Sequence, residues 1–96
     1  MQRFFQTTEA NKIVLYATSV SIIRSTFEQC RIVMRILQNH RIRYELRDVS
    51  IDRQHHKQLN ERMGVEDAPV PQVFAGGVWL GVSFISIPLK VFMSLT

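Results

Sequence analysis

Residues 70–81 read VPQVFAGGVWLG. Within them, two short apolar runs at 72–75 and 78–80 flank Gly76 and Gly77. Two adjacent glycines accept positive φ at both central positions of a tight turn, so this stretch predicts a β-hairpin. The hairpin supplies the antiparallel end of a sheet, and the remaining strands must come from the residues before it.

Two further strands are predicted upstream of the hairpin. Residues 12–17 form a nearly continuous apolar run, which is typical of a buried strand. Residues 43–49 alternate instead, with Tyr44 and Leu46 on one face. A helix that connects two neighbouring strands makes them parallel, because the crossover returns the chain to the same edge of the sheet. We therefore expect an α/β fold with a mixed four-stranded sheet and helices packed on it.

The first helix is expected over residues 25–38. Ser25 and Glu28 have the spacing of a capping box, in which a hydroxyl and a carboxylate satisfy free backbone amides at the start of a helix. Apolar residues then recur at the helical period, which gives the helix one inward face. These residues are Phe27, Cys30, Val33, Met34 and Leu37.

The second helix is expected over residues 52–63. Asp52 is a suitable N-cap, and Gly64 is a suitable left-handed residue at the other end. This helix is polar over most of its surface, so it has a narrow inward face. The residues expected to face the core are Ile51, Leu59 and Met63.

The chain divides into three parts by pattern. Residues 1–11 are polar after two phenylalanines and are expected to form a flexible lead-in. Residues 12–81 hold all of the strand and helix patterns and form the folded domain. Residues 82–96 are rich in apolar side chains, contain no acidic residue and show neither a helical nor an alternating period. We therefore treat this apolar tail as distinct from the domain that it follows.

Composition restricts the class of protein. With 96 residues, of which 46% are hydrophobic and 21% charged, the chain has the composition of one small globular domain. Its single cysteine excludes an internal disulfide and a cysteine-rich zinc site, and it favours a reducing, cytoplasmic compartment. Residues 1–10 lack the apolar run of a signal peptide, and no apolar stretch is long enough to span a membrane.

The net charge of +4 is mildly basic. No long run of like charges and no RNA-binding aromatic motif is present, so nucleic acid is not an expected partner. His55 and His56 point about 100° apart on a helix, so we expect no metal site there. A basic cluster is interpreted either as a solvated face or as a surface for an anion or a partner. It comprises Arg41, Arg43, Arg47 and Arg53.

Four segments of the chain match one family. They read YATS (residues 16–19), RSTFEQC (24–30), RDVS (47–50) and PQVF (71–74). Together with the order of strands and helices, they resemble the glutaredoxin branch of the thioredoxin fold, in particular glutaredoxin domain-containing cysteine-rich proteins and plant glutaredoxin-like proteins. The resemblance covers residues 12–81 and implies a thioredoxin-like domain.

The resemblance implies a glutathione-linked thiol–disulfide oxidoreductase of the monothiol type. In such enzymes a cysteine thiolate takes glutathione from a protein, and a second glutathione removes it. Cys30 is the one thiol available for this role. In the C-P-Y-C motif of the family, however, Cys30 falls on the second cysteine and Phe27 on the nucleophile. Two interpretations stay open: a reactive Cys30, or a Cys30 packed in the core of a redox-inactive protein-interaction module.

The resemblance also implies how glutathione would bind. In the family, the residue equivalent to Val70 offers its backbone to the cysteinyl part of glutathione, and its bond to the next residue, Pro71 here, is cis. Arg24 and Gly81 complete the implied binding set, and glutathione or a glutathionylated protein is the implied partner. The family continues beyond Gly81 with a second glycine and an acidic residue that open its last helix. Both are missing here, so we expect that helix to be lost or altered in residues 82–96.

Overall fold

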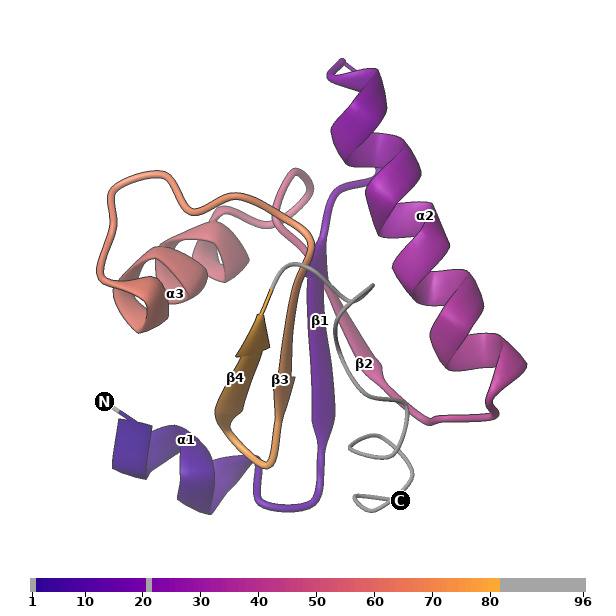
Figure 1. Cartoon of the computed structure of the whole chain (residues 1–96). Coiled ribbons are helices and arrows are strands. Elements are labelled where there is room, and N and C mark those ends of the chain that lie inside the picture. Colours follow the sequence, from indigo (N-terminus) through magenta and orange to yellow (C-terminus); the bar gives the residue numbers. More distant parts are fainter. Residues whose placement is uncertain (1, 21, 82–96) are drawn as a thin grey trace.

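A four-stranded sheet forms the centre of the molecule, with its strands in the order β2-β1-β3-β4 (Figure 1). The computed structural model describes residues 2–20 and 22–81, so the predictions for the apolar tail lie outside the described residues. The β1–β2 pair is parallel, and the β1–β3 and β3–β4 pairs are antiparallel. The predicted mixed sheet is therefore confirmed. Its strands are β1 (Ile13–Ala17), β2 (Glu45–Asp48), β3 (Gln72–Ala75) and β4 (Val78–Gly81).

The hairpin between β3 and β4 turns at the predicted glycines. Gly76 has φ 59° and Gly77 has φ 80°, both in the left-handed region that glycine enters without a steric penalty. The indole N–H of Trp79 donates a hydrogen bond to the side-chain oxygen of Gln72 at 2.8 Å. This bond ties the side chains of the two strands together across the hairpin.

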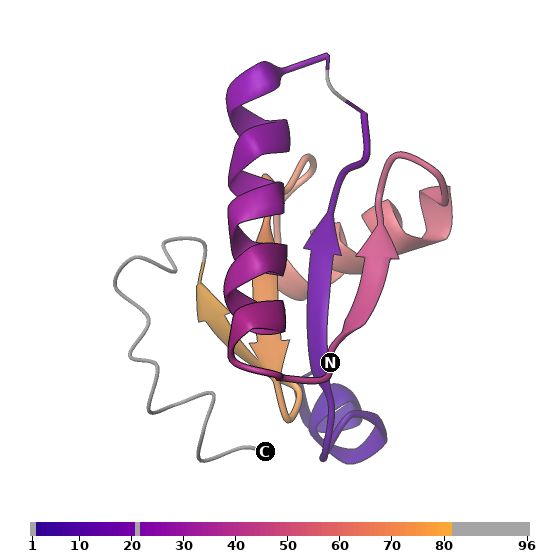
Figure 2. The same cartoon turned by 90° about the vertical axis from the view of Figure 1, so that its right-hand side faces the viewer.

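Helices cover both faces of the sheet (Figure 2). Helix α2 (Arg24–Asn39) packs on one face and α3 (Arg53–Met63) on the other. Strand β1 lies between them and is buried along its whole length, and its successive side chains alternate between the two faces. Leu15 joins the core beneath α2, whereas Tyr16 joins the core beneath α3. None of the described helices is long and apolar enough to cross a membrane.

The limits of α3 follow the prediction. The Asp52 carboxylate accepts a hydrogen bond from the Gln54 backbone N–H at 2.9 Å, and Gly64 follows the helix with φ 70°. Leu59 is fully buried as expected. Ile51 is 77% exposed, so its predicted place in the core is wrong. It lies in the turn before the N-cap, outside the helical register that directs Leu59 to the sheet.

The capping box predicted for α2 does not form. The helix begins one residue earlier than expected, and its N-cap is Ile23, whose side chain makes no capping hydrogen bond. Ser25 then lies inside the first turn rather than at the cap. Glu28 pairs with Arg24 instead, with 3.3 Å between Oε1 and Nε. This i,i+4 ion pair takes the carboxylate that the capping box required.

The two helix starts provide a matched test. Asp52→Ala should lower the free energy of unfolding by about 1 kcal/mol, because it removes the side-chain hydrogen bond at the N-cap of α3. Ser25→Ala should change it by less than about 0.5 kcal/mol, because Ser25 is not a cap. Urea denaturation followed by circular dichroism measures both values. Equal losses in the two variants would contradict the assignment of Ile23 as the N-cap of α2.

The expected flexible lead-in is a helix, α1 (Gln2–Thr8), so the prediction for residues 1–11 was wrong in this part. Phe5 is buried, and Glu9, which directly follows the helix, is buried as well. The Arg62 guanidinium carbon lies 3.8 Å from the centroid of the Phe5 ring. It also lies 3.7 Å from the centroid of the Phe74 ring, on the face that α3 covers. These partners are far along the chain, which is why local pattern gave no sign of them.

Glu9 is the centre of a buried charge network. Its carboxylate lies 2.8 Å from Nη1 of Arg47 and 3.0 Å from Nη2 of Arg62. Both arginines also donate to the Tyr16 hydroxyl, at 2.9 and 3.0 Å. That hydroxyl donates to the side-chain oxygen of Gln58. Arg47 is therefore not part of a solvated basic face, because it forms an ion pair with the buried Glu9. The other members of the predicted basic cluster are exposed: Arg41, Arg43 and Arg53.

Candidate functional site

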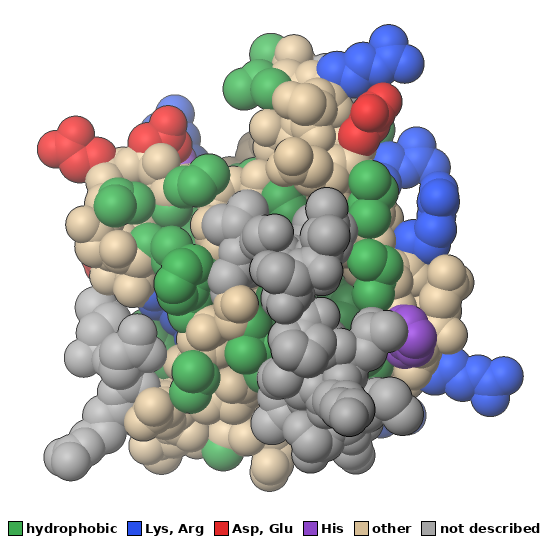
Figure 3. Space-filling view, viewed as in Figure 1, with side chains coloured by type: hydrophobic (Ala, Val, Ile, Leu, Met, Phe, Trp, Pro, Cys, Tyr) green, Lys and Arg blue, Asp and Glu red, His purple; other side chains and the backbone are tan. Residues whose placement is uncertain are grey.

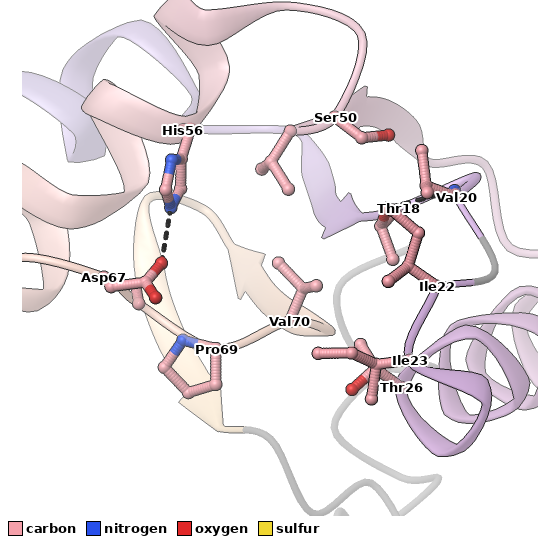
Figure 4. A pocket seen from close by; sticks show the side chains of 12 residues that line it. Thr18, Val20, Ile22, Ile23, Thr26, Ser50, His56, Asp67, Pro69 and Val70 are labelled. Carbon is pink, nitrogen blue, oxygen red and sulfur yellow. Dashed lines mark hydrogen bonds and ion pairs between the residues drawn. The ribbon is translucent and has the colours of Figure 1, made fainter.

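Segments that are far apart in the chain meet at one edge of the sheet. The parallel strands β1 and β2 both end there, and β3 and α2 both begin there. The loop after β1 and the loop before β3 therefore face each other across an open space, which Figure 4 shows from close by. The carboxyl edge of parallel strands is a common place for ligand sites in α/β proteins.

This space, which we call the groove, has a volume of about 680 Å³. That volume is typical of pockets for small ligands or for a few side chains of a partner. The groove is mostly apolar. Its apolar residues are Val20, Ile22, Ile23, Val49, Ala68, Pro69 and Val70. Its polar residues are Thr18, Thr26, Ser50, His56 and Asp67.

Two isoleucines at the rim of the groove are open to solvent. Ile22 is 88% exposed and Ile23 is 63% exposed. Figure 4 places Ile23 on the α2 side, across the groove from Val70. Covering large apolar side chains of this kind is favourable, so the rim is suited to contact with an apolar group.

A hydrogen-bonded pair forms the far wall of the groove. Nε2 of His56, in α3, lies 3.0 Å from Oδ1 of Asp67, in the loop before β3 (Figure 4). The sequence pattern set His56 beside His55 and gave no sign of its pairing with Asp67. No sequence signal could have predicted the pair, because the path of the loop that carries Asp67 decides whether its carboxylate meets His56. Among the described residues, no three metal-ligating side chains come together.

Cys30 is not among the residues that line the groove. Its side chain is 0% exposed and packs with Val33 and Leu37 in the core between α2 and the sheet. Burial raises the pKa of the Cys30 thiol, and a backbone hydrogen bond with Thr18 offsets that effect in part. The thiol is therefore neutral near pH 7, and it does not line the groove.

Phe27, at the position that the resemblance gave to the nucleophile, does not line the groove either. It is half-buried and borders a separate depression together with Arg24, Glu28 and Arg31. The guanidinium carbon of Arg31 lies 5.8 Å from the centroid of the Phe27 ring. Arg24, expected to bind glutathione, is exposed, pairs with Glu28 and does not border the groove.

The residues before β3 include the cis peptide bond that the resemblance implied. Val70 lines the groove, and its peptide bond to Pro71 is cis. Pro71 is buried at the start of β3. Gly81 is the last residue of β4, where it pairs with Val73, and it does not line the groove. Of the four residues expected to hold glutathione, the structure brings Val70 into the groove.

The sequence model of one family, Glutaredoxin, matches residues 13–80. The match runs from the first residue of β1 almost to the end of β4. The chain belongs to the glutaredoxin family. The thioredoxin-like fold expected from the sequence is thereby confirmed. Helix α1 and Glu9 precede the matched region. The glutamate of the buried charge network therefore comes from outside the part of this glutaredoxin domain that matches the family.

Known relatives of this glutaredoxin domain are longer proteins. It is 39% identical over 75 residues to "Glutaredoxin domain-containing cysteine-rich protein 1" of Homo sapiens and to the protein of that name of Mus musculus. It is 38% identical over 73 residues to a glutaredoxin domain-containing cysteine-rich protein of Drosophila melanogaster. Each alignment covers 76% of this chain, but 26% of the human and mouse proteins and 12% of the fly protein. The chain thus spans about a quarter or less of these relatives.

Proposed function

We propose that this glutaredoxin domain is a protein-binding module that uses the groove and performs no thiol chemistry in its native state. The observation that carries the proposal is the position of Cys30, which is fully buried in the core and absent from the lining of the groove. Thiol–disulfide exchange needs a thiolate within reach of the disulfide that it attacks.

The position of Cys30 along α2 supports the same proposal. The helix begins at Arg24, so Cys30 lies beyond its first turn. The positive end of a helix lowers a thiol pKa within the first turn and has little effect further along. Burial acts in the opposite direction and raises the pKa of Cys30. The N-terminus of α2 therefore does not activate the Cys30 thiol, and burial works against its ionisation.

The groove itself supports binding of another protein. Its rim exposes Ile22 and Ile23, and Val70 stands opposite them. An apolar side chain of a partner would remove these residues from water, which stabilises a complex. Ala68, Pro69 and Val70, in the loop before β3, border the same space.

Reaction with a thiol reagent tests the proposal. In the native protein, Cys30 should react with dithiobis(nitrobenzoate) at least about a hundred times more slowly than in the protein unfolded by guanidinium chloride, because the folded core shields the sulfur. The matched control is Cys30→Ser combined with Thr26→Cys, which moves the thiol from the core to the groove. That variant should react rapidly when folded. Rapid reaction of native Cys30, at the rate of the control, would refute the proposal.

A second candidate function rests on family membership and on the place of Val70 in the groove. In it, local opening of α2 exposes Cys30, whose thiolate attacks the mixed disulfide of a glutathionylated protein. The protein thiol leaves, Cys30 becomes glutathionylated, and a second glutathione releases it as glutathione disulfide. Val70, next to its cis bond to Pro71, would then hold glutathione in the groove, in a reducing, cytoplasmic compartment.

Glutathione transfer separates the two functions. The second function requires that the protein remove glutathione from a glutathionylated peptide and that Cys30→Ser abolish the activity, because no other thiol exists in the chain. The binding module requires equal, background rates for both proteins. The amide signal of Val70 on addition of glutathione reports binding separately from turnover, and an unmoved signal would argue against a glutathione site.

A further inference from the structure

The outer surface of α2 carries a row of arginines. Arg24, Arg31 and Arg35 are spaced seven and four residues apart, which places them on one side of a helix. All three are exposed, and Figure 3 shows Lys and Arg side chains along that side of α2. The row extends roughly 16 Å along the helix axis, at 1.5 Å per residue. We call these three residues the α2 arginine row.

Little negative charge balances this row. The one acidic residue of α2 is Glu28, and it pairs with Arg24. Among the described residues, no carboxylate forms an ion pair with Arg31 or Arg35. The arginine row therefore leaves two positive charges available to a ligand. Ile32, which is 44% exposed, lies beside the row and adds apolar surface.

The arginine row and the groove approach each other at the start of α2. Ile23, which lines the groove, directly precedes Arg24, and Thr26 of the first helical turn also lines it. A ligand that fills the groove and continues along α2 would thus meet apolar side chains first and positive charge afterwards. Thr26 and the arginines lie on different sides of α2, so the groove and the arginine row meet only over the first turn of the helix, and we call the two together the binding face.

We propose that this face binds an acidic segment of a partner protein, which places an apolar side chain in the groove and its carboxylates along Arg31 and Arg35. The proposal rests on the proposed function, because it names the kind of partner that the groove accepts. Charge complementarity supports an acidic partner, since an arginine guanidinium forms paired hydrogen bonds with a carboxylate. Segments of this kind combine specificity from charge with affinity from a buried apolar anchor.

The shape of the face favours a protein segment over a membrane surface. A membrane-bound amphipathic helix presents apolar residues along its whole length, between basic flanks. In α2 the apolar face is turned inward, where Cys30, Val33 and Leu37 pack on the sheet. The exposed isoleucines Ile22 and Ile23 lie at one end, before the row of charge. This linear order fits an extended chain better than a plane.

A titration of the isotope-labelled protein tests the proposal. The probe is a short synthetic peptide with a Leu-Phe pair followed by glutamates. When the peptide is added, the amide shifts of the labelled protein should concentrate in α2 and the groove. The affinity for the peptide should fall as salt is added. Arg31→Glu with Arg35→Glu should weaken binding about tenfold or more, because two attractions become repulsions. The matched control, Arg43→Glu with Arg53→Glu, makes the same change in net charge on exposed residues elsewhere and should retain binding.

A groove variant separates this proposal from the proposed function. Ile23→Asp places a charge at the rim and suits the N-cap position, so α2 should remain folded. Loss of binding in Ile23→Asp, with no effect of reversal at Arg31 and Arg35, would overturn the arginine row but keep the groove. Shifts confined to the arginine row, with none in the groove, would overturn the proposed function and this inference in its present form.

The remaining occupants are outcomes of the same test. Binding to vesicles that contain phosphatidylserine, lost on reversal of Arg31 and Arg35, together with no binding of the peptide, would replace the protein segment with a membrane. Shifts of α2 and groove amides that grow with protein concentration alone would assign the face to a second copy of this chain. An even spread of peptide shifts over all exposed arginines would mean nonspecific attraction and would refute the proposal.

Discussion

Replacing Glu9 with alanine should lower the free energy of unfolding by about 3–5 kcal/mol. Glu9 is buried, and its carboxylate is the ion-pair partner of both Arg47 and Arg62. The side chain of Arg62 is 1% exposed, so after the substitution its charge would stay buried without a carboxylate. An unpaired buried charge costs far more than a lost surface contact. Chemical denaturation of the two proteins measures the difference.

Glu28→Ala is the matched control for Glu9. It also breaks an arginine–glutamate pair, but both side chains are exposed, so the expected loss is below about 1 kcal/mol. The comparison separates burial from the mere presence of an ion pair. If Glu9→Ala costs no more than Glu28→Ala, then α1 is not an integral part of the fold.

Gly77→Ala should destabilise the protein by about 3 kcal/mol or more, for two reasons that add. The residue has φ 80°, which disfavours any side chain. A Cβ at this position would also overlap the backbone of Phe5 and Gln6. Backbone atoms cannot move as easily as a flexible side chain, so α1 would have to move away from the hairpin. Glu9 would then lose its contacts with Arg47 and Arg62. Thermal and urea unfolding should both report the loss.

Gly64→Ala isolates the conformational part of that effect. Gly64 has a similar φ of 70°, but a Cβ there would meet nothing within 4 Å. The expected loss is therefore about 1–2 kcal/mol, the cost of the left-handed conformation by itself. A Gly77→Ala variant that is no less stable than Gly64→Ala would show that α1 does not press on the hairpin.

Elements that carry their own local signal could be predicted from the sequence. Gly76 and Gly77 define a turn by their backbone freedom alone, and Asp52 and Gly64 define the ends of α3 in the same way. The order of strands and helices then follows from the alternation of these signals. Parallel pairing of β1 with β2 needed no further information, because a crossover helix permits little else.

Features that depend on distant partners could not be predicted. Helix α1 has a weak local pattern, and it is held by Arg62 and by the hairpin, both far along the chain. Ser25 shows the opposite failure, since a sound capping pattern was overridden when the helix began at Arg24. Capping contributes about 1 kcal/mol, which other contacts of the helix can outweigh.

The site was predicted in part for the same reasons. Val70 was expected in it because the resemblance to glutaredoxins implied a glutathione-binding residue just before β3. Nothing in the sequence pattern marked Ile22 and Ile23 as exposed, because their exposure depends on where α2 begins. The pairing of His56 with Asp67 depends on the path of a loop. Cys30 was left between packing and reactivity, and the structure places it in the core.

The position of α1 has a practical consequence for experiments on this domain. The helix lies beside the β3–β4 hairpin, at the opposite end of the sheet from the groove and from the start of α2 (Figure 1). An affinity tag or a linker to a sensor surface, joined ahead of Gln2, would therefore point away from the groove. Partners could then be captured from solution on an unobstructed face, whereas a label near Val20 would block the surface being probed.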